Sequence, residues 1–208
     1  MTKDKALKNI LFDLGGVILD LNVRATLEGF YHLNFPPQLL RYPENYETDV
    51  FFKYETGRID SDRFRDEIRR IAGTDFSNDA FDRAWLAMLT GVAPRTVKLL
   101  KDLSAKYALY ILSNTSPLHI AKFEQMFAEA AGMTLGELFR KTYYSYEIGQ
   151  HKPDPEAFEF VIRDAGIAPE ETLFLDDNIH NVKAAKALGF HAIHISEYLH
   201  LDRVGFDL

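Results

Sequence analysis

Residues 9–16 read NILFDLGG, a short apolar run that ends in an aspartate and two glycines. Similar runs, each ending in polar or small residues, recur far along the chain: YALYILSNT (107–115), ETLFLDDN (171–178) and HAIHIS (191–196). Runs this short, rich in Ile, Leu, Phe and Tyr, are typical of strands buried on both faces rather than of helices. A fifth run, KTYYSYEIG (141–149), alternates less cleanly and is also predicted to be a strand.

Helical patterns lie between the predicted strands: PRTVKLLKDLSAKY (94–107), PEAFEFVIRDAG (155–166) and NVKAAKALGF (181–190). In the second, Pro155 falls in the first turn and Gly166 at the end, the positions that these two residue types favour in helices. Strands that alternate with helices through short connections predict a parallel sheet covered on both faces. The expected fold class is α/β, with a Rossmann-like parallel sheet.

Residues 20–92 interrupt this alternation. No convincing strand pattern occurs there, and the predicted helices are VRATLEGFYHL (23–33), NYETDVFFKYETG (45–57), SDRFRDEIRRIAG (61–73) and NDAFDRAWLAMLTG (78–91). We therefore expect an all-helical domain over 20–92, inserted into an α/β core formed by 1–19 and 93–208. The insert leaves the core at the carboxyl end of the first strand, the edge at which open α/β sheets bind ligands.

Composition restricts the function classes. The 208 residues carry a formal net charge of −7, which argues against nucleic acid or an anionic membrane surface as the main partner. The absence of cysteine excludes disulfides, thiolate catalysis and Cys-ligated zinc. The first residues, MTKDKALKNI, lack the apolar stretch of a signal peptide, and no window approaches the ~18 apolar residues of a membrane span. A cytoplasmic location is expected, and the oligomeric state stays open.

Carboxylates end two of the predicted strands. Asp13 would be either a turn cap or a nucleophile and metal ligand at the carboxyl edge of the sheet. Asp176 and Asp177 would be either a solvated turn before a helix or a site for a hard divalent cation, because adjacent carboxylates repel unless a cation or a proton relieves them. The pair Gly15–Gly16 after Asp13 allows either close approach of the backbone to a ligand or positive φ in a tight turn.

Two further polar groups have the same ambiguity. Ser113 and Asn114 end the second strand, where they would serve as a helix cap or as an anion-binding turn. Lys152 lies in HKPDP, and is either a solvated surface lysine or a cation directed at phosphate and carboxylate charge. None of these signals is specific alone, but they occur together in one chain order.

In that order the motifs resemble those of the haloacid dehalogenase (HAD) superfamily of phosphohydrolases. FDLGGVILD is similar to its first motif, ILSNT to its second, KPDPEAF to its third and FLDDNIHNVKAAKALG to its fourth. The whole pattern looks most like the α-D-glucose-1-phosphatase-like proteins and the N-terminal phosphatase domain of soluble epoxide hydrolases. The resemblance covers nearly the whole chain, and it implies that the helical insert is the cap domain of a HAD core.

The resemblance also implies an activity: a Mg²⁺-dependent phosphatase that hydrolyses a small phosphorylated metabolite, with a sugar phosphate as one candidate. Asp13 would be the nucleophile that forms an aspartyl-phosphate, which splits hydrolysis into two easier displacements. Mg²⁺ would be held by the Asp13 carboxylate, the Gly15 carbonyl and Asp177, with Asp176 at the edge of that shell. Dehalogenase activity and a phosphoacceptor receiver domain both fit this motif order poorly.

Phosphate recognition is implied in the same way. Ser113 and Asn114 would bind the transferring phosphoryl group, and Lys152 would pair with Asp13 and with the phosphate. The implied arrangement is electrostatically favourable. A pentacoordinate phosphorus beside a carboxylate concentrates negative charge, and this charge is stabilised only when cations lie next to it.

One position departs from the family pattern. The usual first motif is DxD, whose second Asp is the general acid/base, and here Gly15 stands in its place. A glycine carbonyl can still bind a metal, but losing a general acid/base costs roughly 10²–10⁴-fold in rate. The alternative function is therefore a phosphate-ligand-binding or regulatory protein with little turnover. Asp20 is a weak candidate for the missing acid/base, and residues 54–60, YETGRID, would be a plain turn between helices or a substrate-specificity loop.

Overall fold

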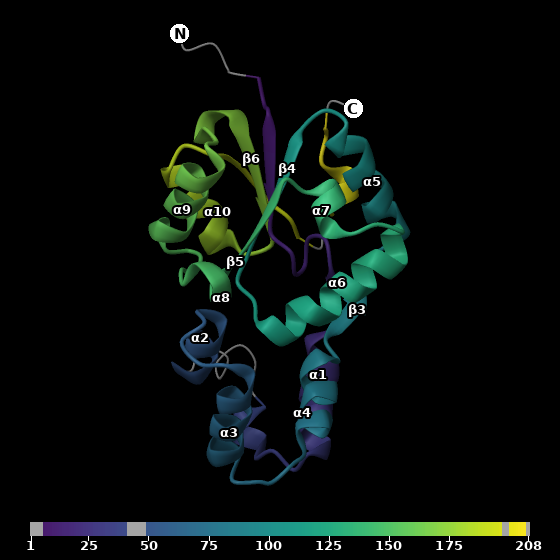
Figure 1. The fold of residues 1–208 in the computed structure, drawn as a ribbon, viewed down its shortest axis with the longest axis vertical. Helices are drawn as coiled ribbons and strands as arrows, with labels where there is room; N and C mark the ends of the chain where they lie inside the picture. Colours follow the sequence, from purple (N-terminus) through teal and green to yellow (C-terminus); the bar gives the residue numbers. More distant parts are fainter. Residues whose placement is uncertain (1–5, 41–48, 197–199, 207–208) are drawn as a thin grey trace.

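The computed structural model describes residues 6–40, 49–196 and 200–206. Its centre is a five-stranded sheet in the order β5-β4-β1-β6-β7, in which every neighbouring pair is parallel (Figure 1). The strands are β1 (Asn9–Phe12), β4 (Ala108–Ser113), β5 (Lys141–Tyr144), β6 (Thr172–Asp176) and β7 (His191–His194). This architecture confirms the predicted α/β class.

The register of the sheet brings the polar strand ends together. Phe12, the last residue of β1, pairs with Ile111 on one side and with Leu175 on the other. The backbone N–H of Asp13 continues this ladder and donates to the Leu175 carbonyl at 2.8 Å. The residues that follow the apolar runs of β1, β4 and β6 therefore meet at one edge of the sheet.

Helices cover both faces of the sheet, because alternate side chains of each strand point to opposite faces. Ile10 and Phe12 of β1 belong to one buried cluster, and Leu11 belongs to the cluster on the other face. Figure 1 shows α9 and α10 on one side of the sheet and α5 and α7 on the other. The core helices are α5 (Pro94–Ser104), α6 (Pro117–Ala131), α7 (Leu135–Leu138), α8 (Ser145–Ile148), α9 (Pro155–Ala165) and α10 (Ile179–Ala187), with short 3₁₀ turns η2 (Pro169–Glu171) and η3 (Leu201–Arg203).

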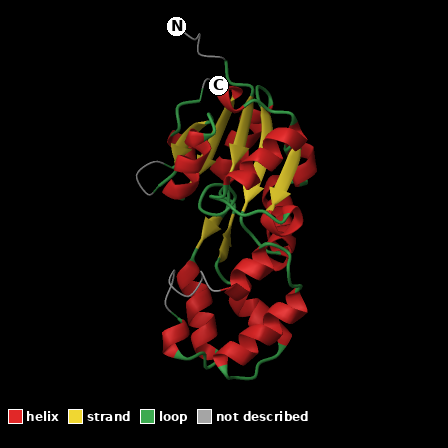
Figure 2. Cartoon of the chain, turned by 90° about the vertical axis from the view of Figure 1, so that its left-hand side faces the viewer, coloured by secondary structure: helices red, strands yellow, loops and turns green. Residues whose placement is uncertain are grey.

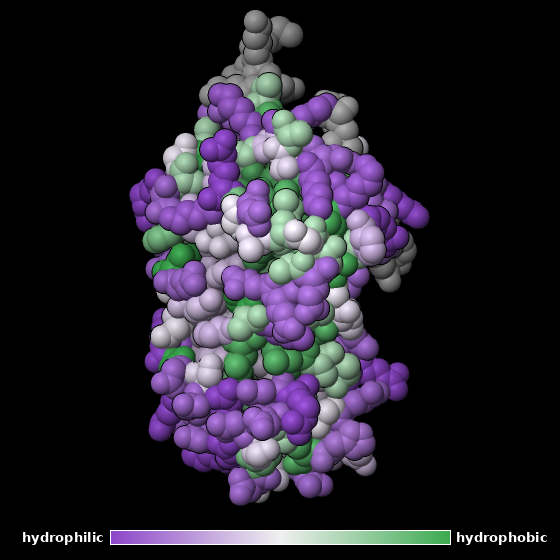
Figure 3. Space-filling view, turned by 45° about the vertical axis from the view of Figure 1, so that its right-hand side comes forward, coloured by the Kyte–Doolittle hydropathy of each residue, from purple (hydrophilic) through white to green (hydrophobic). Residues whose placement is uncertain are grey.

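The described residues of the insert form the helices α1 (Val23–His32), α2 (Asp49–Glu55), α3 (Ser61–Ala72) and α4 (Asn78–Leu86), with the 3₁₀ turn η1 (Pro37–Leu39). They pack around their own aromatic core, in which Trp85, Phe64 and Phe81 are fully buried. Figure 2 shows this helical bundle at the end of the molecule opposite the chain termini. On the face in Figure 3, apolar side chains gather around the middle, and hydrophilic ones cover most of both ends.

The expectation that residues 20–92 contain no strand is wrong. β2 (Asp20–Leu21) and β3 (Leu89–Gly91) pair antiparallel and connect the insert to the core. The predicted helix over 78–91 accordingly ends at Leu86. Strands this short and this exposed show no alternation of polarity, which is why a sequence pattern does not reveal them.

Smaller differences occur at element ends. The predicted strand over 141–149 stops at Tyr144 and continues as helix α8, and residues 45–48 of one predicted helix lie outside the described residues. Helix α6 is not among the predicted elements, although Ser116 caps its first turn and Gly132 ends it in the left-handed conformation. None of the described helices is long and apolar enough to cross a membrane.

Candidate active site

The site begins in the tight turn that follows β1. The Gly16 N–H donates to the Leu19 carbonyl at 2.9 Å, and the Ile18 N–H donates to the Leu14 carbonyl at 2.9 Å. Gly16 has a φ of 71°, and a Cβ there would run into the carboxylate of Asp177. A glycine is therefore required for this turn to approach the loop after β6.

Lys152 connects the two acidic strand ends. Its side chain is 1% exposed, and its Nζ donates to Asp13 Oδ1 at 2.8 Å and to Asp176 Oδ2 at 2.7 Å. The carboxylates of Asp13, Asp176 and Asp177 lie within 4.8 Å of one another. With all four groups ionised, the cluster carries two more negative charges than positive ones, so its donor set and its charge fit a hard divalent cation.

Burial makes this cluster electrostatically costly. Burial is the largest influence on Asp13 and, with the nearby Asp176 and Asp177, raises the pKa of its carboxyl to about 7 against the opposing effect of Lys152. Burial and Asp176 also raise the pKa of the Asp177 carboxyl. Burial alone would lower the pKa of Lys152, but its two carboxylate partners outweigh it and raise that pKa. An added cation would relieve the repulsion among the carboxylates.

Of the three carboxylates, Asp176 accepts the most hydrogen bonds. It is fully buried, and it accepts hydrogen bonds from the Asn178 N–H at 2.7 Å and from Asn181 Nδ2 at 3.0 and 3.1 Å. Asn178 also caps α10 by accepting from the His180 N–H at 2.9 Å. These bonds fix the loop after β6 relative to Lys152.

Asn114 fastens the end of β4 to the loop that carries Lys152. Its Oδ1 accepts from the Lys152 N–H at 2.9 Å, and its Nδ2 donates to the Lys152 carbonyl at 2.7 Å. The same Nδ2 lies 3.1 Å from His151 Nδ1, and His151 Nε2 lies 3.2 Å from Glu55 Oε2 at the end of α2. A chain of polar contacts therefore runs from the lysine loop to the helical insert.

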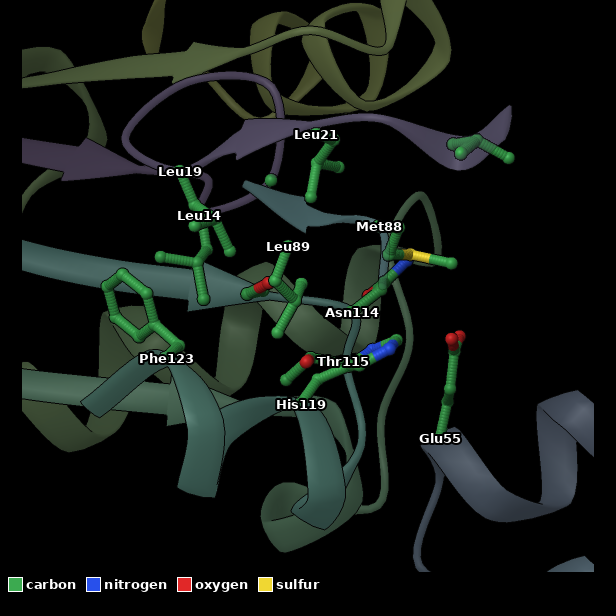
Figure 4. Close-up of a pocket in the computed structure, with 13 residues that line it drawn as sticks. Leu14, Leu19, Leu21, Glu55, Met88, Leu89, Asn114, Thr115, His119 and Phe123 are labelled. Carbon is green, nitrogen blue, oxygen red and sulfur yellow. The ribbon is translucent and has the colours of Figure 1, made fainter. Parts of the chain in front are cut away.

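A cavity of about 170 Å³ opens beside these residues, between the sheet edge and the insert (Figure 4). Gly15, Ser113 and Asn114 line it on the core side, and Glu55 lines it from the insert. A Cβ on Gly15 would lie 2.9 Å from Leu21 Cδ1, so the Leu21 side chain fills the space next to this glycine. An apolar group thus stands beside the position where the family pattern has a carboxylate.

Comparisons with known proteins agree with this geometry. A family model described as haloacid dehalogenase-like hydrolase matches residues 7–189. The chain belongs to this HAD-like hydrolase family. It is 33% identical, over 88% of its length and 89% of the relative's, to D-ribitol-5-phosphate phosphatase of Bacteroides thetaiotaomicron. It is 26% identical, over 92% of its length and 91% of the relative's, to a sesquiterpene phosphatase of Aspergillus oryzae.

A solved structure gives the same result. The chain is similar to a HAD family enzyme of B. thetaiotaomicron in complex with magnesium and inorganic phosphate, with a TM-score of 0.85 and 36% identity. The alignment covers 92% of this chain and 95% of the other. The HAD relationship expected from the motifs is confirmed.

The structure brings the predicted site residues of this HAD protein to one place. Asp13, Lys152 and Asp176 are in direct contact, and Asp177 is adjacent to them. Gly15, Ser113 and Asn114 line the cavity next to this cluster. Which of them bind metal or phosphate stays a prediction at this point.

The remaining candidates from the sequence, Asp20 and residues 54–60, lie in different environments. Asp20, the candidate for the missing acid/base, is exposed in β2. Tyr54 is buried in the insert, where its hydroxyl lies 2.8 Å from Ser61 Oγ. Glu55 does line the cavity. The contact of Glu55 with His151 and the position of Leu21 beside Gly15 have no signal in the sequence, because both depend on how the insert meets the core.

Proposed function

We propose that this protein is a Mg²⁺-dependent phosphatase of a small phosphorylated metabolite, acting through an aspartyl-phosphate on Asp13. The observation that carries the proposal is the buried Lys152 Nζ between Asp13 and Asp176, with a third carboxylate within 4.8 Å, at the carboxyl edge of a parallel sheet. Sugar and sugar-alcohol phosphates are the first substrates to assay, because a relative 33% identical is named for ribitol 5-phosphate.

Asp13, Asp177 and the Gly15 carbonyl would hold the Mg²⁺. Asp176 would lie at the edge of that shell, because it already accepts from Lys152 Nζ and from Asn181 Nδ2. When bound, the ion supplies positive charge that stabilises the charge developing on the transferred phosphoryl oxygens.

The side chains of the chain divide the reaction into two steps. An Asp13 oxygen attacks the phosphorus, a new P–O bond forms, and the bond from phosphorus to the alcohol oxygen breaks. Ser113 and Asn114 would bind the phosphoryl oxygens, and Lys152 would balance their charge and keep Asp13 ionised. Water then attacks the phosphorus, the bond from phosphorus to the Asp13 oxygen breaks, the proton of the water passes to solvent, and phosphate and the free Asp13 carboxylate are released. Gly15 offers no proton, so the departing alkoxide takes one from solvent, which favours leaving groups of low pKa.

The test is steady phosphate release from a panel of phosphorylated metabolites, with and without Mg²⁺. We expect turnover that requires Mg²⁺ and that disappears in Asp13→Asn. A metal-loaded protein that is inactive across the panel would refute the proposal. The helical insert would act as the cap over this site, and a cytoplasmic location stays a prediction.

One observation favours the second candidate, a phosphate-binding protein with little turnover: Leu21 occupies the space beside Gly15. Gly15→Asp, made together with Leu21→Ala to provide room, separates the two candidates. A gain of about 10²-fold or more in turnover supports the binding protein, because it shows that the natural chain lacks an effective acid/base. An unchanged rate supports the phosphatase.

A further inference from the structure

We propose that Glu55 selects the substrate by binding a hydrogen-bond donor, a hydroxyl or an ammonium group, at the end of the leaving group farthest from the phosphate. The inference rests on the proposed phosphatase function and narrows its substrate class. Figure 4 shows Glu55 across the cavity from Leu14, Leu19 and Leu21, the residues around the Gly15 turn. The relatives do not fix this class, since one is named for a polyol phosphate and another for a sesquiterpene.

The lining of this cavity is mainly apolar. The apolar side chains that line the cavity are Leu14, Leu19, Leu21, Val23, Met88, Leu89 and Phe123. Such walls accept carbon chains but do not distinguish one polar group from another, because they offer no hydrogen-bonding partner. Discrimination therefore depends on the few polar groups in the lining of the cavity.

Glu55 is the charged group among the described residues that line this cavity. The other titratable side chain there, His119, stacks on Trp85 with ring centroids 4.7 Å apart, and its Nε2 lies 3.3 Å from the Trp85 carbonyl. Burial lowers the pKa of His119 to about 4, so this histidine is neutral near pH 7. A donor at the far end of a ligand would thus find its anionic partner in Glu55.

The hydrogen-bond network fixes the direction of the Glu55 carboxylate. Because Asn114 Oδ1 accepts from the Lys152 N–H, Asn114 Nδ2 is the donor toward His151 Nδ1. The ring hydrogen of a neutral His151 is then on Nε2, where it faces Glu55 Oε2 at 3.2 Å. One oxygen of Glu55 is engaged by the core, and the carboxylate keeps acceptor capacity for a ligand. Its side chain is 15% exposed, which reduces competition from water.

Packing of the insert against the core sets the position of Glu55. Two residues later, Gly57 has a φ of 68°, and a Cβ there would run into the Tyr146 carbonyl of α8. On the preceding turn of α2, the Phe52 ring lies 5.5 Å from the His151 ring. These contacts hold the end of α2 at the mouth of the site, so a carboxylate on the insert becomes part of a cavity in the core.

Pairs of substrates that differ only at the far end test the inference. Alkyl phosphates and ω-hydroxyalkyl or ω-aminoalkyl phosphates of equal length, from propyl to hexyl, have closely similar ester chemistry. We expect the best hydroxyl or amino compound to exceed its alkyl partner about tenfold or more in kcat/KM, as a hydrogen bond to a charged acceptor allows. Glu55→Ala should remove both preferences, and Glu55→Gln should remove mainly the amino preference.

Glu67→Gln is the matched control, because Glu67 is a carboxylate of the insert that pairs with Arg63 and Arg70 and does not line this cavity. It should leave both ratios unchanged. Equal kcat/KM values within every pair for the natural protein, or ratios that survive in Glu55→Ala, would overturn the inference. Ratios are compared within one variant, so a general loss of activity or of folded protein cancels.

Failure of the proposed function gives a different result. If no phosphate ester is hydrolysed with Mg²⁺ present, that function falls, and calorimetric binding of the corresponding alkylphosphonates and ω-hydroxyalkylphosphonates tests Glu55 without turnover. Tighter binding of the hydroxylated phosphonate, lost in Glu55→Ala, would then support the role of Glu55. Equal binding of the two would overturn it.

Discussion

Replacing Lys152 by methionine removes the cation between Asp13 and Asp176 while keeping a side chain of similar length. The Lys152 side chain is 1% exposed and Asp176 is fully buried, so little water replaces the lost ammonium group. Removing one partner of a buried ion pair costs about 3–5 kcal/mol, because the remaining charge is left uncompensated. We expect a loss of this size in the free energy of unfolding of the metal-free protein at pH 8.

The expected change in melting temperature follows from chain length. For a 208-residue chain, 1 kcal/mol corresponds to about 2–4 °C, so the loss amounts to roughly 6–20 °C. The difference in free energy of unfolding between the natural protein and Lys152→Met should be smaller at pH 5. The folded protein then binds protons at its crowded carboxylates more readily than the unfolded chain does, and protonation removes the uncompensated charge. Added Mg²⁺ should recover part of the loss at pH 8.

Urea unfolding and thermal melts at pH 5 and pH 8, each with EDTA or Mg²⁺, provide the measurement. Lys98→Met is the control, since Lys98 forms an exposed i,i+4 pair with Asp102 and should contribute less than about 1 kcal/mol. A loss below 1 kcal/mol for Lys152→Met at pH 8, or an equal loss at both pH values, would refute this account of the cluster.

Three other predictions concern single residues: Asp13, His119 and Gly57. Because burial raises the pKa of Asp13 from 3.8 to about 7, the metal-free protein should lose stability as pH rises through this range; melts of Asp13→Asn should lack that slope, and an equal slope would contradict it. Because the pKa of His119 falls from 6.5 to about 4, stability should also decline as pH drops below 6.5; His119→Gln should flatten this acid limb, and an unchanged limb would show that another group causes it. Gly57 and Gly73 both have positive φ, but of the two only Gly57 faces backbone, the Tyr146 carbonyl of α8. In thermal melts, Gly57→Ala should therefore lower the free energy of unfolding by about 1–3 kcal/mol more than Gly73→Ala does, and in assays it should also lower activity more. Equal losses in the two variants would show that docking on α8 is not involved.

The sheet and the acidic cluster could be predicted because both depend on local sequence. A buried strand followed by a polar residue is visible at Asp13, Ser113 and Asp176, and parallel strands place such ends at one edge. A shared edge does not fix which strands are neighbours, so the grouping of these residues with Lys152 was expected from the resemblance to the HAD motifs, and neither the Lys152 contacts nor their distances could be predicted.

The parts that could not be predicted depend on how the insert meets the core. The Glu55–His151 contact joins residues 96 positions apart, and neither residue carries a pattern that points to the other. The exposed pair β2–β3 is too short to show periodicity. Helix α6 is a different case, because the Ser116 cap and the Gly132 stop are readable signals.

The central position of β1 has a consequence for synthesis of the chain. β1 is made first, but Asn9 pairs with Ala108 on one side and with Thr172 on the other. At about 5–20 residues per second, the first partner strand emerges from the ribosome many seconds after β1, and the second emerges later still. The described helices of the insert are completed in the meantime, and the buried residues of their aromatic core all belong to the insert. The apolar strand that carries the nucleophile candidate thus waits without its neighbours, and it is the segment of the nascent chain for which we expect protection by a chaperone to matter most.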